Sequence, residues 1–218
     1  VQEPFGNAVH ACQAADLRGK TVAILGTGTI GLFAVLIARG MGAHRVIGIE
    51  PNKGNQELAR RLGCHEILAP ATPPPERAWA ADPALKAAVL DLTDGQGVDV
   101  ALEMAGFNDS VNNAVQITRR GGHVVLFGVR NGDAVLQDAH RIVMNGLQIS
   151  GIVGRRLFET WQITRALLEQ SDNGIQQAVW EVILNKGEGP IVDIRDFQRD
   201  AFEATMAAHP KPLIKFSG

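Results

Sequence analysis

The sequence has few cysteines, no excess of charge and no visible targeting segment. Its 218 residues include only two cysteines, Cys12 and Cys64, which lie far apart and in no CxxC pattern. A disulfide framework and a cysteine-rich zinc cluster are therefore not encoded, and we expect a reducing, cytoplasmic setting. With 21 basic and 23 acidic residues, the net charge of −2 favours a small-molecule ligand over a nucleic-acid or membrane partner.

Two further absences are a targeting signal at the start of the chain and charged residues in one long stretch. No signal peptide or lipidation motif is visible and the first residue is Val1 rather than methionine, so we expect a fragment of a longer protein. The stretch from Thr21 to Ala38 carries no charge, which by itself is the pattern of a membrane span. Three glycines at turn spacing within it, followed at once by polar residues, argue against a span.

What the sequence does contain is a complete strand, glycine turn, helix and second strand between Thr21 and Glu50. The apolar residues 22–25 lead into Gly26-Thr-Gly28-Thr-Ile-Gly31, and a second apolar run ends on Glu50, nineteen residues after the last glycine. A GxGxxG pattern alone is weak evidence. In this context it predicts a dinucleotide-binding unit.

Each residue type in this unit has a physical reason. Gly26 allows a tight turn, Gly28 removes the Cβ that would block a pyrophosphate, and Gly31 lets the helix pack closely. The helix that starts near Thr29 directs its free N–H groups and positive dipole end at the phosphates. The Glu50 carboxylate can accept hydrogen bonds from the adenosine ribose and would repel a 2′-phosphate, so NAD is favoured over NADP.

Strand and helix patterns alternate over the first 150 residues. They predict an α/β fold of the Rossmann type, with a doubly wound parallel sheet of six strands and helices on both faces. Asn108 or Asp109 is expected to cap one helix and Asp196 another, and the proline-rich residues 69–83 are expected to form a surface loop. After residue 153 we expect helices at residues 158–168 and 175–184 and strands at 191–194 and 213–216. The strands of the main sheet are expected at residues 22–25, 46–49, 66–68, 98–102, 123–127 and 147–153.

Four segments, in the same order, resemble the medium-chain, zinc-dependent alcohol dehydrogenases, most closely the members that oxidise L-threonine. The resemblance covers nearly the whole chain, and its first and last segments are more specific than the glycines. It implies oxidation of a secondary alcohol, L-threonine or a similar amino alcohol, by NAD with a catalytic zinc. The four segments are Gln2-Glu-Pro-Phe-Gly-Asn-Ala-Val-His10, the glycine unit, Gly97-Val-Asp-Val-Ala-Leu-Glu-Met104 and Gly151-Ile-Val-Gly-Arg-Arg-Leu-Phe-Glu-Thr-Trp161.

The resemblance also implies roles for individual residues. Glu3 matches the acid beside the catalytic zinc, as an alternate ligand or part of a proton relay, so it is the candidate catalytic and metal-binding residue; the alternative is a solvated terminal acid. Arg155 either reaches the cofactor phosphates or lies on the surface. Asn55 replaces an arginine that the family often has beside the ribose, with Lys53 as a candidate substitute. Asn55 is expected on the adenosine side of the cofactor, and residues 127–129 and 152–153 on the nicotinamide side. The expected cofactor-binding residues are Gly26, Gly28, Thr29, Ile30, Gly31, Glu50, Asn55, Phe127, Gly128, Val129, Ile152, Val153 and Arg155.

In this family the other zinc ligands lie in an N-terminal catalytic domain, which we expect this chain to lack. We divide the chain into a linker helix (residues 1–20), an NAD-binding domain (21–155) and a C-terminal segment (156–218) that packs toward the missing domain. His10 and Cys12 are expected to be helix residues, since two groups alone make no zinc site. The strand from Leu147 to Val153 is expected at the sheet edge, where it would form a homodimer or tetramer.

Three alternatives stay open. The substrate could be a polyol or another secondary alcohol, because the proline-rich insertion and residues 176–189 depart from the family pattern. The chain could be a stand-alone NAD-binding or redox-sensing module without catalysis. A methyltransferase also uses a glycine-rich loop and a strand-end acid, although the match at residues 151–161 argues against it.

Overall fold

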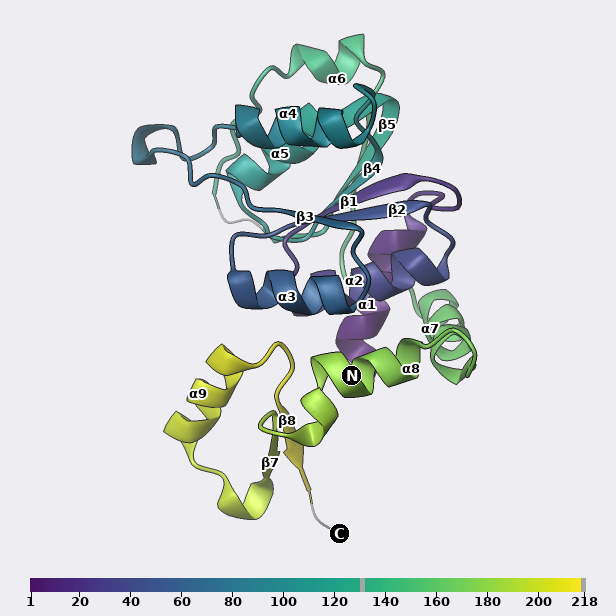
Figure 1. The fold of residues 1–218 in the computed structure, drawn as a ribbon, viewed down its shortest axis with the longest axis vertical. Coiled ribbons are helices and arrows are strands. Elements are labelled where there is room, and N and C mark those ends of the chain that lie inside the picture. The colour runs from purple at the N-terminus through teal and green to yellow at the C-terminus, as the bar shows by residue number, and fades with distance from the viewer. Residues whose placement is uncertain (130–131, 217–218) are drawn as a thin grey trace.

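The computed structural model describes residues 1–129 and 132–216, and its central feature is a six-stranded parallel sheet (Figure 1). The strands are β1 (Thr21–Leu25), β2 (Arg45–Ile49), β3 (Glu66–Leu68), β4 (Val98–Glu103), β5 (Thr118–Leu126) and β6 (Gln148–Gly151). Their order across the sheet is β3-β2-β1-β4-β5-β6, and every neighbouring pair is parallel. The chain thus reverses its direction of winding between β1 and β4, as in dinucleotide-binding folds. The predicted fold class is confirmed.

Helices cover both faces of the sheet because the strands alternate their apolar side chains. In β1, Val22 and Ile24 join one core cluster, while Ala23 and Leu25 join the other. In Figure 1 the first face carries α1 (Gln2–Gln13), α2 (Thr29–Gly40) and α3 (Lys53–Arg61), and the second carries α4 (Pro83–Leu92) and α5 (Asn108–Ile117), with α6 (His140–Met144) beyond them.

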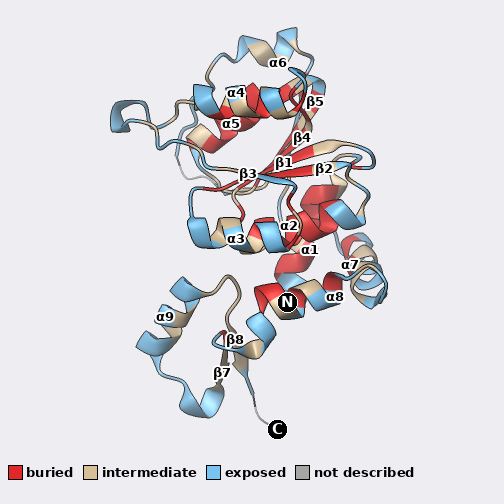
Figure 2. Cartoon of the chain, in the orientation of Figure 1, coloured by how far each residue is buried: buried red, intermediate tan, exposed pale blue. Residues whose placement is uncertain are grey.

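Helix α2 explains the long uncharged stretch. It packs against the sheet on one side and α1 on the other, where the rings of Phe5 and Phe33 meet edge to face at 5.5 Å. Its residues 31–38 are all buried, and Figure 2 shows burial concentrated in the sheet and the helices against it. In the part of the chain that the structure describes, no helix has the length and apolar character needed to cross a bilayer.

The expected cap of α5 is wrong. Phe107 occupies the cap position, and no side chain caps the helix. Asn108 instead pairs with Val135: its Nδ2 donates to the Val135 carbonyl and its Oδ1 accepts from the Val135 N–H, both at 2.8 Å. Two bonds to a distant loop outcompete one local capping bond, because they satisfy both ends of the amide.

The end of the proline-rich loop is organised by Asp82. Its Oδ1 accepts from Ala84 N–H at 2.8 Å, which caps α4, and its Oδ2 accepts from Ala71 N–H at 2.8 Å, which closes the loop. Pro83 takes the first helical position, where no N–H is needed. Within the loop, residues Pro75–Arg77 form a single 3₁₀ turn, so the absence of longer regular structure agrees with the sequence.

Two strand boundaries differ from expectation. Strand β5 begins at Thr118, five residues before the expected start, because α5 ends at Ile117 and the chain pairs with β4 at once through an irregular register near Val98. Strand β6 is shorter than the expected segment from Leu147 to Val153, although Ile152 N–H still donates to the Leu126 carbonyl beyond its end.

The remaining chain forms helices and a small separate sheet. Helix α7 (Glu159–Glu169) is followed by α8 (Ile175–Ala178), which continues as a π-helical turn, Val179–Ile183, so the expected helix to residue 184 changes hydrogen-bonding pattern midway. A 3₁₀ turn, Asn185–Gly187, leads to β7 (Ile191–Asp193), which pairs in parallel with β8 (Leu213–Lys215).

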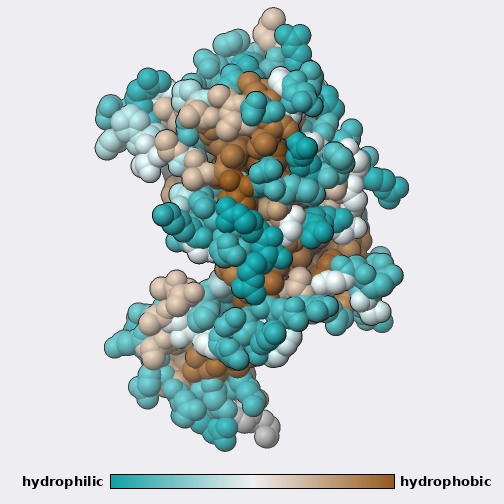
Figure 3. All heavy atoms as spheres, viewed as in Figure 1, coloured by the Kyte–Doolittle hydropathy of each residue, from teal (hydrophilic) through white to brown (hydrophobic). Residues whose placement is uncertain are grey.

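Helix α9 (Arg199–Ala208) joins these two strands, and we call residues 191–216 the C-terminal lobe. The lobe lies beside α8 and away from the large sheet (Figure 1). On the face in Figure 3 it shows its own small group of hydrophobic residues, separate from the band across the main body. The expected cap at Asp196 is wrong, because Asp193 accepts from Arg195 N–H at 3.0 Å and α9 begins after Gln198 without a side-chain cap.

Candidate cofactor site

The turn from β1 into α2 requires two of its glycines for steric reasons. Gly26 has φ of +89°, and a Cβ added there would lie 2.9 Å from the Ala105 Cβ. A Cβ at Gly31 would lie 2.0 Å from the Gly26 carbonyl oxygen. The first turn of α2 therefore packs directly on the end of β1, which places the helix N-terminus at the carboxyl edge of the sheet.

Gly28 has a different environment. It is the N-cap of α2, no side chain caps that helix, and a Cβ at Gly28 would meet no heavy atom within 4 Å. The first N–H groups of α2 and its positive dipole end face this open space, an arrangement that suits a phosphate. Thr29 Oγ1 donates a hydrogen bond to the Pro210 carbonyl, so the C-terminal lobe touches the start of the same helix.

Glu50 follows β2 and is held by main-chain donors. Its Oε2 accepts from Thr27 N–H at 2.8 Å and from Thr27 Oγ1 at 3.3 Å, and its Oε1 accepts from Asn52 N–H at 2.9 Å. The residue is only 6% exposed. Since each carboxylate oxygen can accept two bonds, the fixed carboxylate keeps acceptor capacity for a further donor.

A cavity of about 320 Å³ lies against Gly26, Gly28 and Glu50, with Asn55 also in its wall. Its floor is formed by the carboxyl ends of β1, β2 and β4, the point where the order of the strands reverses and where ligands of such sheets bind. The structure thus brings together the adenosine side of the predicted site. The Asn55 N–H itself donates to Asn52 Oδ1 at 3.1 Å.

A sequence model of the family described as zinc-binding dehydrogenase matches residues 29–170, well over half of the chain. The chain belongs to the zinc-binding dehydrogenase family.

Curated relatives in this family include L-threonine 3-dehydrogenases. The Pyrococcus horikoshii protein is 35% identical over 169 residues, which are 78% of this chain and 46% of that protein. The Pyrococcus furiosus protein is 32% identical over 214 residues, 98% of this chain and 56% of that protein. The chain therefore spans about half the length of the curated relatives it matches, and the resemblance inferred from four sequence segments is confirmed.

Solved structures give the same family. An alcohol dehydrogenase from Thermotoga maritima superposes with a TM-score of 0.79 at 25% identity, covering 97% of this chain and 55% of that chain. A putative zinc-binding dehydrogenase from Sinorhizobium meliloti 1021 bound to NADP superposes with a TM-score of 0.67 at 25% identity, covering 88% and 50%.

The predicted nicotinamide side of this zinc-binding dehydrogenase chain lies at the ends of β5 and β6. The N–H groups of Phe127 and Gly128 donate to the Glu103 carbonyl at 2.9 and 3.0 Å. These donors are engaged by the protein, so a bound nicotinamide would meet carbonyl groups or exposed side chains here. Val129 and Val153 are 87% and 85% exposed, whereas Ile152 packs against the core. The nicotinamide contacts remain predictions.

Glu103 is a residue that sequence reasoning missed. It is fully buried at the end of β4, and its Oε1 accepts from Ala105 N–H, Gly106 N–H and Ser110 Oγ at 2.8 to 2.9 Å. Its Oε2 has no hydrogen-bond partner among the described residues, and burial raises the pKa of the carboxyl group. Glu103 fixes the turn whose Ala105 lies against Gly26. The available signal was an acid at the end of a buried apolar strand.

Glu3, in the first turn of α1, and Arg155, which follows β6, lie together. Glu3 Oε1 accepts from Asn7 Nδ2 at 2.9 Å and stands 3.7 Å from Arg155 Nη1. His10 Nδ1 lies 2.9 Å from the Gly154 carbonyl oxygen, so a proton on Nδ1 makes it the donor. The first and last family segments are thus in contact, and Arg155 has an acid partner instead of a described contact with the glycine turn.

The residues present do not fit a zinc ion. Within residues 1–129 and 132–216, no three His, Cys, Asp or Glu side chains stand close enough to hold a metal. Both cysteines are buried; burial raises the pKa of the Cys12 thiol and raises that of Cys64 to about 12. Neither is therefore a ready thiolate ligand, and Glu3 stands alone as the predicted metal-binding residue.

Proposed function

We propose that this chain is the NAD-binding half of a zinc-dependent dehydrogenase that oxidises a secondary alcohol, L-threonine or a similar amino alcohol. NAD, once bound, is the hydride acceptor, and the residues of this chain bind and orient it. Zinc and the catalytic domain belong, in this proposal, to the rest of a longer protein. The substrate rests on the L-threonine 3-dehydrogenases to which the chain is similar.

The observation that carries the proposal is the fixed carboxylate of Glu50. Thr27 and Asn52 hold both of its oxygens in the wall of the cavity beside Gly28. A ribose hydroxyl group can donate to the acceptor position that remains, whereas a 2′-phosphate would place negative charge beside it. This supports NAD over NADP, although one relative in the family was solved with NADP.

Titration of the chain with NADH and with NADPH tests the cofactor. We expect tighter binding of NADH, and we expect Glu50→Gln to weaken NADH binding about tenfold, which corresponds to about 1.4 kcal/mol, and to remove the preference over NADPH. Glu57→Gln, on the exposed surface of α3, is the matched control and should change either affinity less than twofold. Tighter binding of NADPH by the unchanged chain would contradict the proposal.

Turnover tests the reaction and the substrate. The 218-residue chain should show no oxidation of L-threonine in the presence of zinc and NAD, while the full-length protein should oxidise it. A full-length protein that oxidises a diol or polyol but not L-threonine would favour the first alternative substrate class. The stand-alone module would be favoured if the coding sequence upstream of Val1 encodes no zinc ligands.

A further inference from the structure

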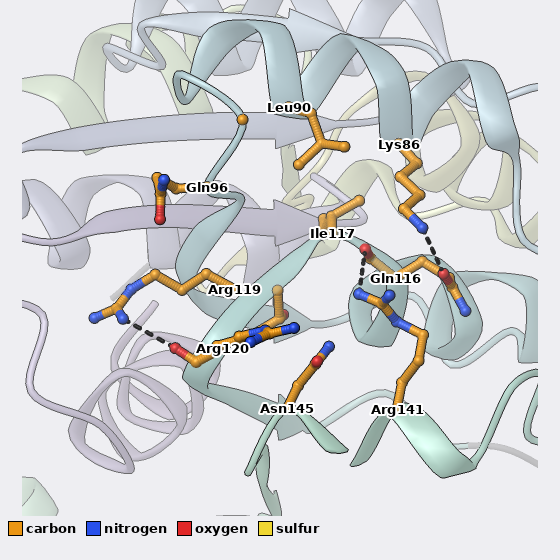
Figure 4. Close-up of a pocket in the computed structure, with 11 residues that line it drawn as sticks. Lys86, Leu90, Gln96, Gln116, Ile117, Arg119, Arg120, Arg141 and Asn145 are labelled. Carbon is orange, nitrogen blue, oxygen red and sulfur yellow. Dashed lines mark hydrogen bonds between the residues drawn. The ribbon is translucent and has the colours of Figure 1, made fainter. Parts of the chain in front are cut away.

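A second cavity lies at the opposite end of the sheet from Glu50. It has a volume of about 310 Å³ and is lined by α4, the end of α5, the start of β5 and helix α6 (Figure 4). Strand β5 begins at this cavity with Thr118 and ends at Leu126, next to the predicted nicotinamide side. The whole length of a nine-residue strand therefore separates the two cavities, and one ligand cannot occupy both.

The wall of this cavity is strongly basic. Lys86, Arg119, Arg120 and Arg141 line it, and no aspartate or glutamate does. Arg119 is paired, since its Nε lies 2.6 Å from Asp99 Oδ1. The other three form no ion pair with any carboxylate in the described part of the chain, although the chain as a whole carries a net charge of −2.

Two of the three unpaired cations, Lys86 and Arg141, are oriented by neutral oxygens of Gln116. Lys86 Nζ donates to Gln116 Oε1 at 3.1 Å, and Arg141 Nη2 donates to the Gln116 carbonyl at 3.4 Å. Gln116 Nε2 in turn donates to Asp138 Oδ2 at 3.1 Å, which turns the amide oxygen toward Lys86. Figure 4 shows Lys86 and Arg141 approaching Gln116 from opposite sides. Neutral acceptors fix these side chains but leave their charges uncompensated.

The Arg141 guanidinium is only partly satisfied by the chain. Its Nε is buried and has no hydrogen-bond partner among the described residues. Buried donors are nearly always paired, so the Arg141 guanidinium keeps unmet donor capacity beside the cavity that it lines.

We propose that this cavity binds a small anion with a phosphate group, either inorganic phosphate or a phosphate monoester. Guanidinium groups match phosphate oxygens in a two-pronged geometry, and Arg120, Arg141 and Lys86 come from three different elements around one space. The carboxyl ends of α4 and α5 also face this region and weaken anion binding. Three unpaired cations outweigh those two partial charges.

Nuclear magnetic resonance can locate the anion. We would titrate the ¹⁵N-labelled chain with sodium phosphate, and separately with glycerol 3-phosphate, against sodium chloride at equal ionic strength. Saturable shifts of the backbone amides at residues 119–122 and 145 are the expected result. Saturation by both ligands identifies the phosphate group as sufficient, and saturation by the ester alone identifies a phosphorylated metabolite. Shifts confined to residues 26–31, or shifts that chloride reproduces, would overturn the proposal.

A charge-removing variant tests the residues. R120Q/R141Q should weaken phosphate binding at least tenfold, while R165Q/R199Q should change it less than twofold. The control removes two exposed arginines that pair with Glu169 and Glu203 on other helices. If R120Q/R141Q does not fold, K86Q provides the second test, with a threefold or larger loss expected. Affinities equal to those of the unchanged chain would refute the site. NADH affinity should be unchanged in all variants, so failure here is distinct from failure of the proposed function.

Discussion

Gly28 and Gly31, in the turn between β1 and α2, differ in what an added side chain would meet. At Gly31 a Cβ would meet the protein itself, 2.0 Å from the Gly26 carbonyl oxygen, whereas at Gly28 it would enter open space. We therefore expect Gly31→Ala to lower the free energy of unfolding by more than about 3 kcal/mol. Gly28→Ala should lower it by less than about 1 kcal/mol but weaken NADH binding at least tenfold.

Urea denaturation and NADH titration of both variants measure these effects. Unchanged NADH affinity in Gly28→Ala would show that the pyrophosphate does not pass over Gly28.

Glu103 gives a prediction about pH. Burial raises the pKa of its carboxyl group, although bonds from Gly106, Ser110 and Ala105 act in the opposite direction. Because the folded protein holds this proton more tightly than the unfolded chain, the Glu103 contribution to stability falls as pH rises from about 4.5 through the raised pKa. Glu103→Gln cannot ionise, so its free energy of unfolding should rise relative to that of the unchanged protein across this window.

Denaturation curves at several pH values between about 5 and 8 give the difference between the two proteins. Glu57→Gln, an exposed acid on α3, should run parallel to the unchanged protein. A Glu103→Gln curve that is also parallel would contradict the pH assignment.

Among individual residues, the sequence predicted those whose role depends on their close neighbours along the chain. The glycine turn and Glu50 belong to one contiguous unit, so spacing was enough to bring them together. Glu103 could not be assigned in the same way, because its surroundings depend on Ser110 and on Gly128, where a Cβ would lie 2.7 Å from Glu103 Oε2. Gly128 is placed by the pairing of β4 with β5, and Ser110 by the packing of α5 on β4.

Among the elements, α4 depends on Asp82 for its start. This side chain caps the helix at Ala84 N–H and closes the proline-rich loop at Ala71 N–H. Asp82→Ala removes both bonds, so we expect the free energy of unfolding to fall by about 1 to 2 kcal/mol. Urea denaturation measures the loss, and Asp91→Ala, an exposed position near the end of the same helix, should change stability by less than about 0.5 kcal/mol. Equal effects of the two substitutions would contradict the cap.

Strand positions followed from the sequence better than helix ends did. The inner strands β1, β2 and β4 are largely apolar runs buried on both faces, which leaves little choice of register. Caps depend on competition: Asn108 could bond its own helix but pairs with Val135, which lies 27 residues further along the chain. A sequence pattern does not contain such a distant partner.

For the whole molecule, the exposed edge of β6 predicts self-association. Strand β6 pairs only with β5 in the described sheet, and Ile149 is 38% exposed. We expect two copies to join through this edge, since unpaired strand edges invite pairing. Ile149→Lys should convert the dimer to a monomer at the same concentration by placing like charges across the interface.

Analytical ultracentrifugation measures the mass. Glu66→Lys on β3, at the opposite edge of the sheet, is the matched control and should stay dimeric. A monomeric mass for the unchanged chain at high concentration would contradict the prediction.

The overall architecture could be predicted because one periodic pattern runs through 150 residues, but the basic cavity could not. Lys86, Arg120 and Arg141 are separated in sequence by 34 and 21 residues, and each alone looks like an ordinary surface cation. They meet only because α4, α5, β5 and α6 pack around one space. The C-terminal lobe was likewise visible as strands and a helix, but its contact with Thr29 through Pro210 required the three-dimensional fold.

The way Glu50 is held has a consequence for redesign of cofactor preference. Its carboxylate engages the N–H groups of Thr27 and Asn52 and the Thr27 hydroxyl. Replacing Glu50 by a short neutral residue such as serine would remove the negative charge and release these three donors into the same small volume. Those donors are of the kind that binds phosphate, so a single substitution would both remove the barrier to a 2′-phosphate and prepare its receptor.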